Sequence, residues 1–293
     1  MRKTVLFILS TPYAGSHYLS LMLGSHSQAL HLGEMKRVCL AENRPESREC
    51  TFHRGNILEG LGAKDTPHVY ETIFARAEPQ VQLLVDNTKR VRWAERFLTN
   101  PAYDRKFVHL IRDPRAIIRR YRMGSHFRKQ LRERWKLFRK LPEVRAAIFF
   151  QRSDLVWLYA WLRQNQEITR FLTERRLEHI VVTYRDLARD PAAEIRRIME
   201  WAGLPFELPQ LEYWNFEHVG TEKRGYEWVK EKKVTFIDLR WQSDLPAEIR
   251  ERVRRDRPTA RYLSTLNLRM VDDGLTRLPE LRAGPVPAAH TTA

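Results

Sequence analysis

Three segments of the chain share one hydropathy pattern: a short apolar run, a polar tip, and then apolar residues at helical spacing. The runs are residues 5–9, 81–85 and 106–111. Continuous apolar runs of this length are typical of strands covered on both faces of a parallel sheet. Their alternation with helices predicts right-handed crossovers and an α/β fold of three layers, in which helices flank a parallel sheet.

The first polar tip, Tyr13–His17, contains Gly15 and leads into a helix that carries Leu19 and Met22 and ends at Gly24. A helix N-terminus reached through a glycine turn offers unpaired N–H groups and the positive end of a dipole, which suits a phosphate. An ordinary strand–turn–helix unit without a ligand fits the same pattern. The other two tips are Asp86–Lys89 and Arg112–Arg115. Ligands of such sheets bind beyond the carboxyl ends of the strands, so we expect all three tips at one edge.

The rest of the chain extends this single domain, which we place at residues 1–270. Residues 35–69 are irregular in pattern and are expected to form loops and short helices, with a lid over the site as one interpretation. A fourth strand is predicted at residues 179–184 and a helix from Asp190 to Ala202, ended by Gly203. Another helix is predicted from Pro246 to about Val253. Residues 272–293 are expected to form a frayed, disordered tail.

The net charge of +16 predicts an anionic partner, which could be nucleic acid, a nucleotide, an acidic glycan or an anionic membrane surface. The segment Arg119–Lys140 holds ten Lys and Arg residues against Glu133 alone. An apolar stripe within it predicts an amphipathic helix; it consists of Phe127, Leu131, Trp135 and Phe138. Its basic face is either simply solvated or a patch that binds the acceptor or an anionic surface.

The cysteine content and the hydropathy profile indicate the cellular compartment in which the protein is expected. Cys39 and Cys50 are too few for a disulfide framework, and with His53 they match no zinc spacing, so free thiols and no metal site are expected. No apolar stretch approaches the roughly 20 residues of a membrane span. The apolar run after the basic N-terminus is shorter than a signal-peptide core. A cytoplasmic location is therefore the expectation.

Two common phosphate-binding motifs are absent. A nucleoside triphosphatase or P-loop kinase needs G-x-x-x-x-G-K-[ST], and the turn at Gly15 has neither the lysine nor the second glycine. The dinucleotide fingerprint G-x-G-x-x-G is also missing. What remains is a phosphate turn combined with a second anion site at Arg112.

The ordered motifs resemble those of the sulfotransferases that use 3′-phosphoadenosine 5′-phosphosulfate (PAPS). The matching segments are Pro12–Leu19, Leu110–Ala116, Val182–Pro191, Gly203–Phe206 and His218–Gly220, followed by Arg240-Trp241 before the last predicted helix. Leu32–Glu34 and Asp86–Lys89 are similar to the L-G-E and D-S-S-K elements of the bacterial branch of that family. The resemblance extends from about Val5 to Leu266.

The resemblance implies a P-loop-like nucleotide-binding fold and transfer of a sulfuryl group from PAPS, without a metal, to a hydroxyl or amine. The acceptor would be a carbohydrate, a lipid or a small molecule, and it could be anionic. For catalysis the resemblance implies Glu34 as the base, with Lys89 or His17 as a source of positive charge. For donor binding it implies Tyr13, Ala14, Gly15, Ser16, His17 and Tyr18 around the 5′-phosphosulfate, Arg112 and Arg120 at the 3′-phosphate, and Tyr184, Gly220, Thr221 and Arg224.

This chain departs from the family pattern at two positions. Tyr13 stands where the family often has Lys or Arg, and Arg120 stands where a serine usually follows the 3′-phosphate arginine by eight residues. An altered donor pose is therefore one alternative, since a guanidinium can also hold a phosphate. Acceptor selection is expected in residues 35–69 and in the helical segment of residues 119–175. The alternative from another class is a basic protein that binds nucleic acid or a membrane surface without catalysis.

Overall fold

The computed structural model describes residues 2–40, 57–123, 127–140, 145, 153–216, 218 and 237–279. Of the residues singled out above, Cys50, His53, Gly220, Thr221 and Arg224 lie outside these ranges. Among the described residues, no helix combines the length and the apolar character needed to cross a membrane.

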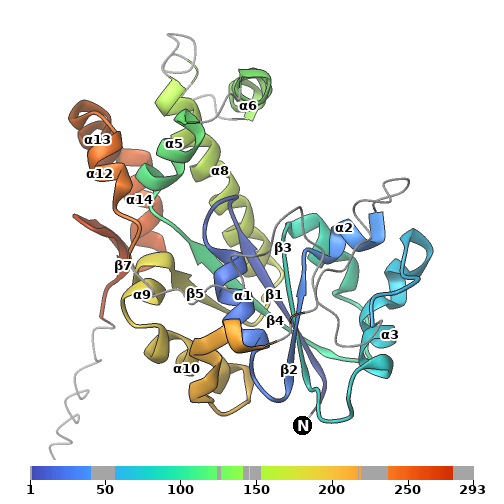
Figure 1. The fold of residues 1–293 in the computed structure, drawn as a ribbon. Coiled ribbons are helices and arrows are strands. Elements are labelled where there is room, and N and C mark those ends of the chain that lie inside the picture. Colours follow the sequence, from blue (N-terminus) through green and yellow to red (C-terminus); the bar gives the residue numbers. More distant parts are fainter. Residues whose placement is uncertain are drawn as a thin grey trace, which may run out of the picture.

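A parallel five-stranded sheet of order β2-β3-β1-β4-β5 forms the centre of the molecule (Figure 1). Its strands are β1 (Thr4–Ser10), β2 (Ala29–Gly33), β3 (Leu83–Lys89), β4 (Asp104–Ile111) and β5 (His179–Thr183). Every residue of the central strand β1 is buried, as its unbroken apolar run predicts. The predicted α/β class and the parallel sheet are confirmed.

Strand β2 has no counterpart in the sequence prediction. It is a five-residue edge strand in which His31 interrupts the apolar pattern, and it pairs only with β3, where Ala29 lies opposite Leu83. A strand this short is specified by its partner rather than by its own pattern. Strand β3 also continues through the tip that was expected to follow it, because Asp86–Lys89 belong to the strand.

Helices cover both faces of the sheet, which confirms the three layers. Side chains of β1 alternate between two cores: Val5 and Phe7 pack in a cluster with side chains of α3 (Val69–Arg76) and the C-terminal half of α8 (Ser153–Glu174). Leu6 packs on the opposite face, in a cluster with α1 (Ser16–Gly24) and α10 (Pro191–Ala202). Helix α10 begins at Pro191 after the Asp190 cap and ends at Gly203 with φ 92°, as predicted.

A third cluster lies beyond β4 and joins α5 (Pro114–Arg122) to the N-terminal half of α8 and to the C-terminal helices. These are α12 (Arg240–Asp244), α13 (Ala247–Arg254) and α14 (Arg257–Thr265). Helix α14 was not predicted. The remaining elements are α2 (Met35–Leu40), η2 (Ala63–His68), α4 (Val91–Ala94), η3 (Glu95–Phe97), α6 (Phe127–Lys140), α9 (Tyr184–Arg189) and η5 (Leu208–Asn215).

Two expectations about boundaries are wrong. The basic segment Arg119–Lys140 is not one helix, because its first residues belong to α5 and α6 starts anew at Phe127. Residues 274–277 are not part of a frayed tail: β7 (Gly274–Arg277) pairs antiparallel with β6 (Leu268–Val271). The Arg277 amide donates to Asp186 at 3.2 Å, which fastens this hairpin to α9.

Candidate functional site

The turn between β1 and α1 requires glycine at position 15 for two reasons. Gly15 caps α1 with φ 97°, a left-handed conformation that side chains disfavour. A Cβ at Gly15 would also lie only 2.6 Å from the ring of Tyr184, the first residue of α9. The nine-residue helix α1 thus starts beneath a tyrosine ring, with its first N–H groups turned toward the sheet edge.

Of the four described non-glycine residues with positive φ, two lie at the tips of adjacent strands. Tyr13, just beyond β1, and Lys89, at the end of β3, both have φ 67°. A left-handed conformation in a non-glycine residue costs on the order of 1–3 kcal/mol and is typical of functional sites. Gly33, at the tip of β2, has φ 70° as well. These three tips therefore share an unusual geometry at one edge of the sheet.

Arg112 occupies one flank of the β1–α1 turn. Its Nη1 donates to the Tyr13 carbonyl at 3.0 Å, and its guanidinium lies 4.2 Å from the centre of the Tyr184 ring. The indole of Trp161 donates to the Arg112 carbonyl at 2.9 Å, so the backbone is held as well as the side chain. We call Arg112 with Tyr13 and Tyr184 the arginine flank.

Arg120 reaches the same flank from two turns further along α5. Its guanidinium lies 5.3 Å from the centre of the exposed Tyr13 ring. The Tyr13 ring also packs edge-to-face with Tyr121, at 5.4 Å between ring centres. Tyr13, which replaces a cation of the family pattern, is thus covered by a cation from elsewhere in the chain. The structure brings the sequence-predicted Tyr13, Arg112, Arg120 and Tyr184 together.

The partner of Arg112 was not predicted from the sequence. Arg112 Nη2 donates to Asp238 Oδ2 at 2.8 Å, and Arg240 donates to both carboxylate oxygens of Asp238, at 2.7 and 2.8 Å. Hydrogen bonds from Arg240, together with Arg112, hold the pKa of Asp238 well below its usual range despite burial. Arg112 is therefore positioned to bind an anion and holds a carboxylate here.

Glu34 forms the centre of the opposite flank, at the tip of β2. Its Oε1 accepts from Lys89 Nζ, and its Oε2 lies 2.8 Å from Arg37 Nε. Burial by itself raises the pKa of Glu34, but the charges of Lys89 and Arg37 outweigh it and lower the pKa below the usual value. Glu34 is thus ionised at neutral pH. We call Glu34, Lys89 and Arg37 the glutamate flank.

His17 connects the glutamate flank to α1. Its Nδ1 lies 2.9 Å from Asn87 Nδ2, which also donates to the Ser20 hydroxyl at 2.9 Å. Because Asn87 Nδ2 is a donor, Nδ1 of His17 is the acceptor. Burial, and then the charge of Lys89, lower the pKa of His17 to about 3. A pKa this low leaves the His17 ring neutral near pH 7, which favours Lys89 over His17 as the source of positive charge.

A buried network supports the tip of β3 from below. Asp86 Oδ1 accepts from the Thr88 amide at 2.7 Å, and Oδ2 accepts from Tyr70 and Trp93 at 2.5 and 2.7 Å. Burial raises the pKa of Asp86 despite these hydrogen bonds. Thr88 in turn accepts from the Lys36 amide at 3.2 Å. The strained tip that carries Lys89 is thus fixed to both the core and α2.

A family model described as the sulfotransferase family matches residues 6–208. The chain belongs to the sulfotransferase family. The match includes the β1–α1 turn, Glu34, Lys89, Arg112 and Tyr184, and it ends before Asp238 and Arg240.

Sulfotransferase relatives include human carbohydrate sulfotransferase 6, which is 28% identical over 174 residues. The alignment covers 52% of this chain and 40% of that protein. Mouse carbohydrate sulfotransferase 5 gives the same identity and coverage. The matched region thus spans less than half the length of these relatives.

Solved sulfotransferase domains share the fold. The sulfotransferase domain from the curacin biosynthetic pathway superposes with a TM-score of 0.54 at 19% identity, over 90% of this chain and 97% of that one. The sulfotransferase domain from the Synechococcus PCC 7002 olefin synthase gives a TM-score of 0.53 at 21% identity, over 92% and 96%. The P-loop-like sulfotransferase fold expected from the motifs is confirmed.

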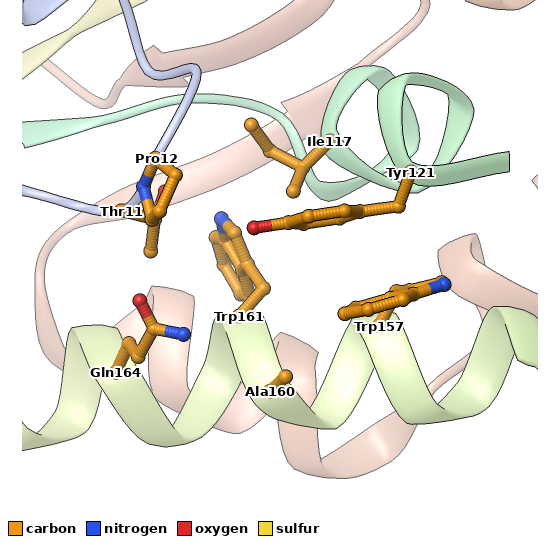
Figure 2. Close-up of a pocket in the computed structure, with 8 residues that line it drawn as sticks. All are labelled: Thr11, Pro12, Ile117, Tyr121, Trp157, Ala160, Trp161 and Gln164. Atoms are coloured by element: carbon orange, nitrogen blue, oxygen red, sulfur yellow. The ribbon is translucent and has the colours of Figure 1, made fainter. Parts of the chain in front are cut away.

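Beside the turn of this sulfotransferase lies a small cavity between α5 and α8 (Figure 2). It is lined by Thr11, Pro12, Ile117, Tyr121, Trp157, Ala160, Trp161 and Gln164. Its volume of about 10 Å³ is close to that of one water molecule, too small for an acceptor. Tyr121 stacks on Trp157 at 4.0 Å, so the wall behind the turn is rigid.

Of the cysteines and histidine considered above as metal ligands, Cys39 lies in the described part of the chain. Cys39 is buried, and burial raises the pKa of its thiol to about 12. Within the described ranges, no group of three His, Cys, Asp or Glu side chains converges as metal ligands would. The predicted donor-binding residues Gly220, Thr221 and Arg224 lie outside those ranges.

Proposed function

We propose that this protein transfers a sulfuryl group from PAPS to a hydroxyl or amine of an acceptor. One observation carries the proposal: the β1–α1 turn lies between a cationic flank and a carboxylate flank at one sheet edge. Arg112 contacts the turn at Tyr13, and Asn87 links His17 of the turn to the strand that bears Lys89.

PAPS carries two separated anionic groups, and the site offers a place for each. The 5′-phosphosulfate would bind at the start of α1, from Ala14 to Tyr18, where the N–H groups of the first helical turn and the helix dipole favour an anion. The 3′-phosphate would bind Arg112, which already holds a carboxylate. Arg120 would add a second cation above Tyr13.

The glutamate flank supplies the groups that transfer requires. Glu34 would take the proton from the acceptor hydroxyl while the acceptor oxygen forms a bond to sulfur. The bond between sulfur and the bridging oxygen of the 5′-phosphate breaks, and adenosine 3′,5′-bisphosphate leaves. Lys89 would neutralise the charge that develops on this leaving phosphate, which positioned cations stabilise strongly in related phosphoryl transfers.

The acceptor that we favour is a carbohydrate. The support is the similarity to carbohydrate sulfotransferases 6 and 5, each 28% identical to part of this chain. The net charge of +16 is consistent with an anionic glycan. A P-loop kinase is disfavoured because the turn holds no lysine.

The test is transfer of radiolabelled sulfate from PAPS to a panel of glycans, lipids and phenols, in the presence of a metal chelator. We expect labelled product with at least one glycan. In parallel, adenosine 3′,5′-bisphosphate should raise the melting temperature, because a ligand bound to the folded state stabilises it. The absence of any thermal shift at millimolar nucleotide would contradict the proposal, whatever acceptor is used.

A further inference from the structure

Helix α6 (Phe127–Lys140) lies at the periphery of the molecule. Figure 1 shows it at one end, near α5 and the beginning of α8 and away from the sheet. It packs against α8. Arg145 lies over the ring of Phe138, 5.2 Å from its centre, and adds a further cation beside the helix. Leu131 and Trp135 remain at least half exposed and are accessible to a partner.

The apolar stripe of α6 is exposed rather than buried. Leu131, Trp135 and Phe138 are 50%, 65% and 39% exposed, and their spacing places them on one face of the helix. The rings of Trp135 and Phe138 stack on each other at 6.4 Å. Met123, just before α6, is 65% exposed. Apolar side chains gathered in this way on a surface are typical of an interaction site.

Cations border this stripe on both sides. Helix α6 contains seven Lys and Arg residues and one acidic residue, Glu133. At 100° per residue, Arg134 lies beside one edge of the stripe, and Arg132 and Arg139 lie beside the other. Arg132 and Arg139 are exposed. The face thus combines a large apolar ridge with positive charge along both of its margins.

We propose that this face of α6 docks on an anionic lipid bilayer, with the helix lying in the plane of the headgroups. The argument is complementarity: the headgroup boundary accepts apolar side chains below and cations at the level of the phosphates. Trp135 is the residue type that prefers this boundary. A nucleic acid duplex offers the phosphates but no apolar layer for Leu131 and Phe138. The inference does not depend on sulfuryl transfer.

The experiment is co-flotation of the full chain with vesicles of phosphatidylcholine alone or mixed with phosphatidylserine. Wild-type protein should float with the phosphatidylserine vesicles and only weakly with the neutral ones. The double variant Trp135→Ala/Phe138→Ala should lose about tenfold or more in partitioning, because the buried apolar area is lost. The double variant Arg132→Glu/Arg139→Glu should lose at least as much, because cations near an anionic surface are attracted to it and the new carboxylates are repelled.

The matched control is Arg170→Glu/Arg261→Glu, which changes the net charge equally at exposed positions on α8 and α14. It should bind like the wild type, and all variants should melt at the wild-type temperature. Three results would overturn the proposal: no vesicle binding by the wild type, an equal loss in the control, or unchanged binding in the Trp135/Phe138 variant. A dimer that dissociates in the Trp135/Phe138 variant would overturn it in favour of a second copy as the occupant.

Discussion

The two flanks of the β1–α1 turn use the same kinds of side chain in opposite arrangements. On the arginine flank, one carboxylate, Asp238, is surrounded by guanidinium groups of Arg112 and Arg240. On the glutamate flank, one carboxylate, Glu34, is held between Lys89 and Arg37. The two flanks differ in whether the strand tip supplies the cation, as with Arg112, or the carboxylate, as with Glu34.

On the arginine flank the cation is the fixed part. Arg112 is held through its backbone by Trp161 and through its side chain by Tyr13 and Tyr184, whereas Asp238 approaches from far along the chain. On the glutamate flank the carboxylate and Lys89 both sit on strand tips, and the latter tip is strained. A fixed cation with an exchangeable carboxylate suits anion binding, and an ionised carboxylate beside a cation suits proton removal.

The largest expected effect is on the glutamate flank. Glu34→Gln removes the base and keeps one acceptor oxygen, for either Lys89 or Arg37, so sulfate transfer should fall by about 10²–10⁴-fold. The dissociation constant of adenosine 3′,5′-bisphosphate, measured by calorimetry, should stay within about twofold if the flanks are separate in function. A loss of nucleotide affinity as large as the loss of sulfate transfer would contradict the separate roles of the two flanks.

On the arginine flank the expected effect is on binding. Arg112→Ala should weaken binding of adenosine 3′,5′-bisphosphate by about 10–100-fold, since hydrogen bonds to charged groups contribute about 1.5–3 kcal/mol. The matched control is Arg119→Ala on α5, the helix that follows Arg112; it removes the ion pair with Asp244 but should not alter nucleotide affinity. Equal nucleotide affinities of the Arg112 variant and the wild type would show that the 3′-phosphate does not bind at this flank.

Asp238 tests whether the carboxylate on the arginine flank is exchangeable. If it competes with the 3′-phosphate for Arg112, then Asp238→Asn should tighten nucleotide binding by up to about tenfold, the equivalent of roughly 1.4 kcal/mol. Asp244→Asn removes the same charge from the ion pair with Arg119 and should leave affinity unchanged. Weaker binding by the Asp238 variant would instead show that Asp238 positions Arg112.

The smallest effect concerns the pH dependence of the glutamate flank. Burial raises the pKa of Glu34, and Lys89 and Arg37 lower it by more. Arg37→Gln removes one lowering charge, so the pKa of Glu34 rises. Since the base must be ionised, the acid limb of kcat/KM should move to higher pH. Lys36→Gln, one residue earlier, is the control. If the acid limb of kcat/KM stays in place in the Arg37 variant, a group other than Glu34 determines the pH dependence.

Local sequence was sufficient for the framework of the fold and for half of the site. The apolar runs within β1, β3 and β4 are strong signals because the part of a strand that is covered on both faces is mostly apolar. Two parts of the site also follow from local sequence. Gly15 provides the left-handed cap of α1, and Asp113 caps α5 by accepting from the Arg115 amide at 2.7 Å. These features depend on residues within one turn of each other.

Only the tertiary structure decided the features that depend on residues far apart in sequence. Strand β2 exists because β3 offers it an edge, and β7 because β6 and Asp186 hold it. The Asp238–Arg112 pair joins residues 126 positions apart, which no local pattern indicates. The lowered pKa of His17 follows from burial and from the charge of Lys89, and the exposure of Trp135 follows from the position of α6 at the periphery of the molecule. Periodicity fixes which face of an element is apolar, but the free energy of burial depends on what the fold places against that face.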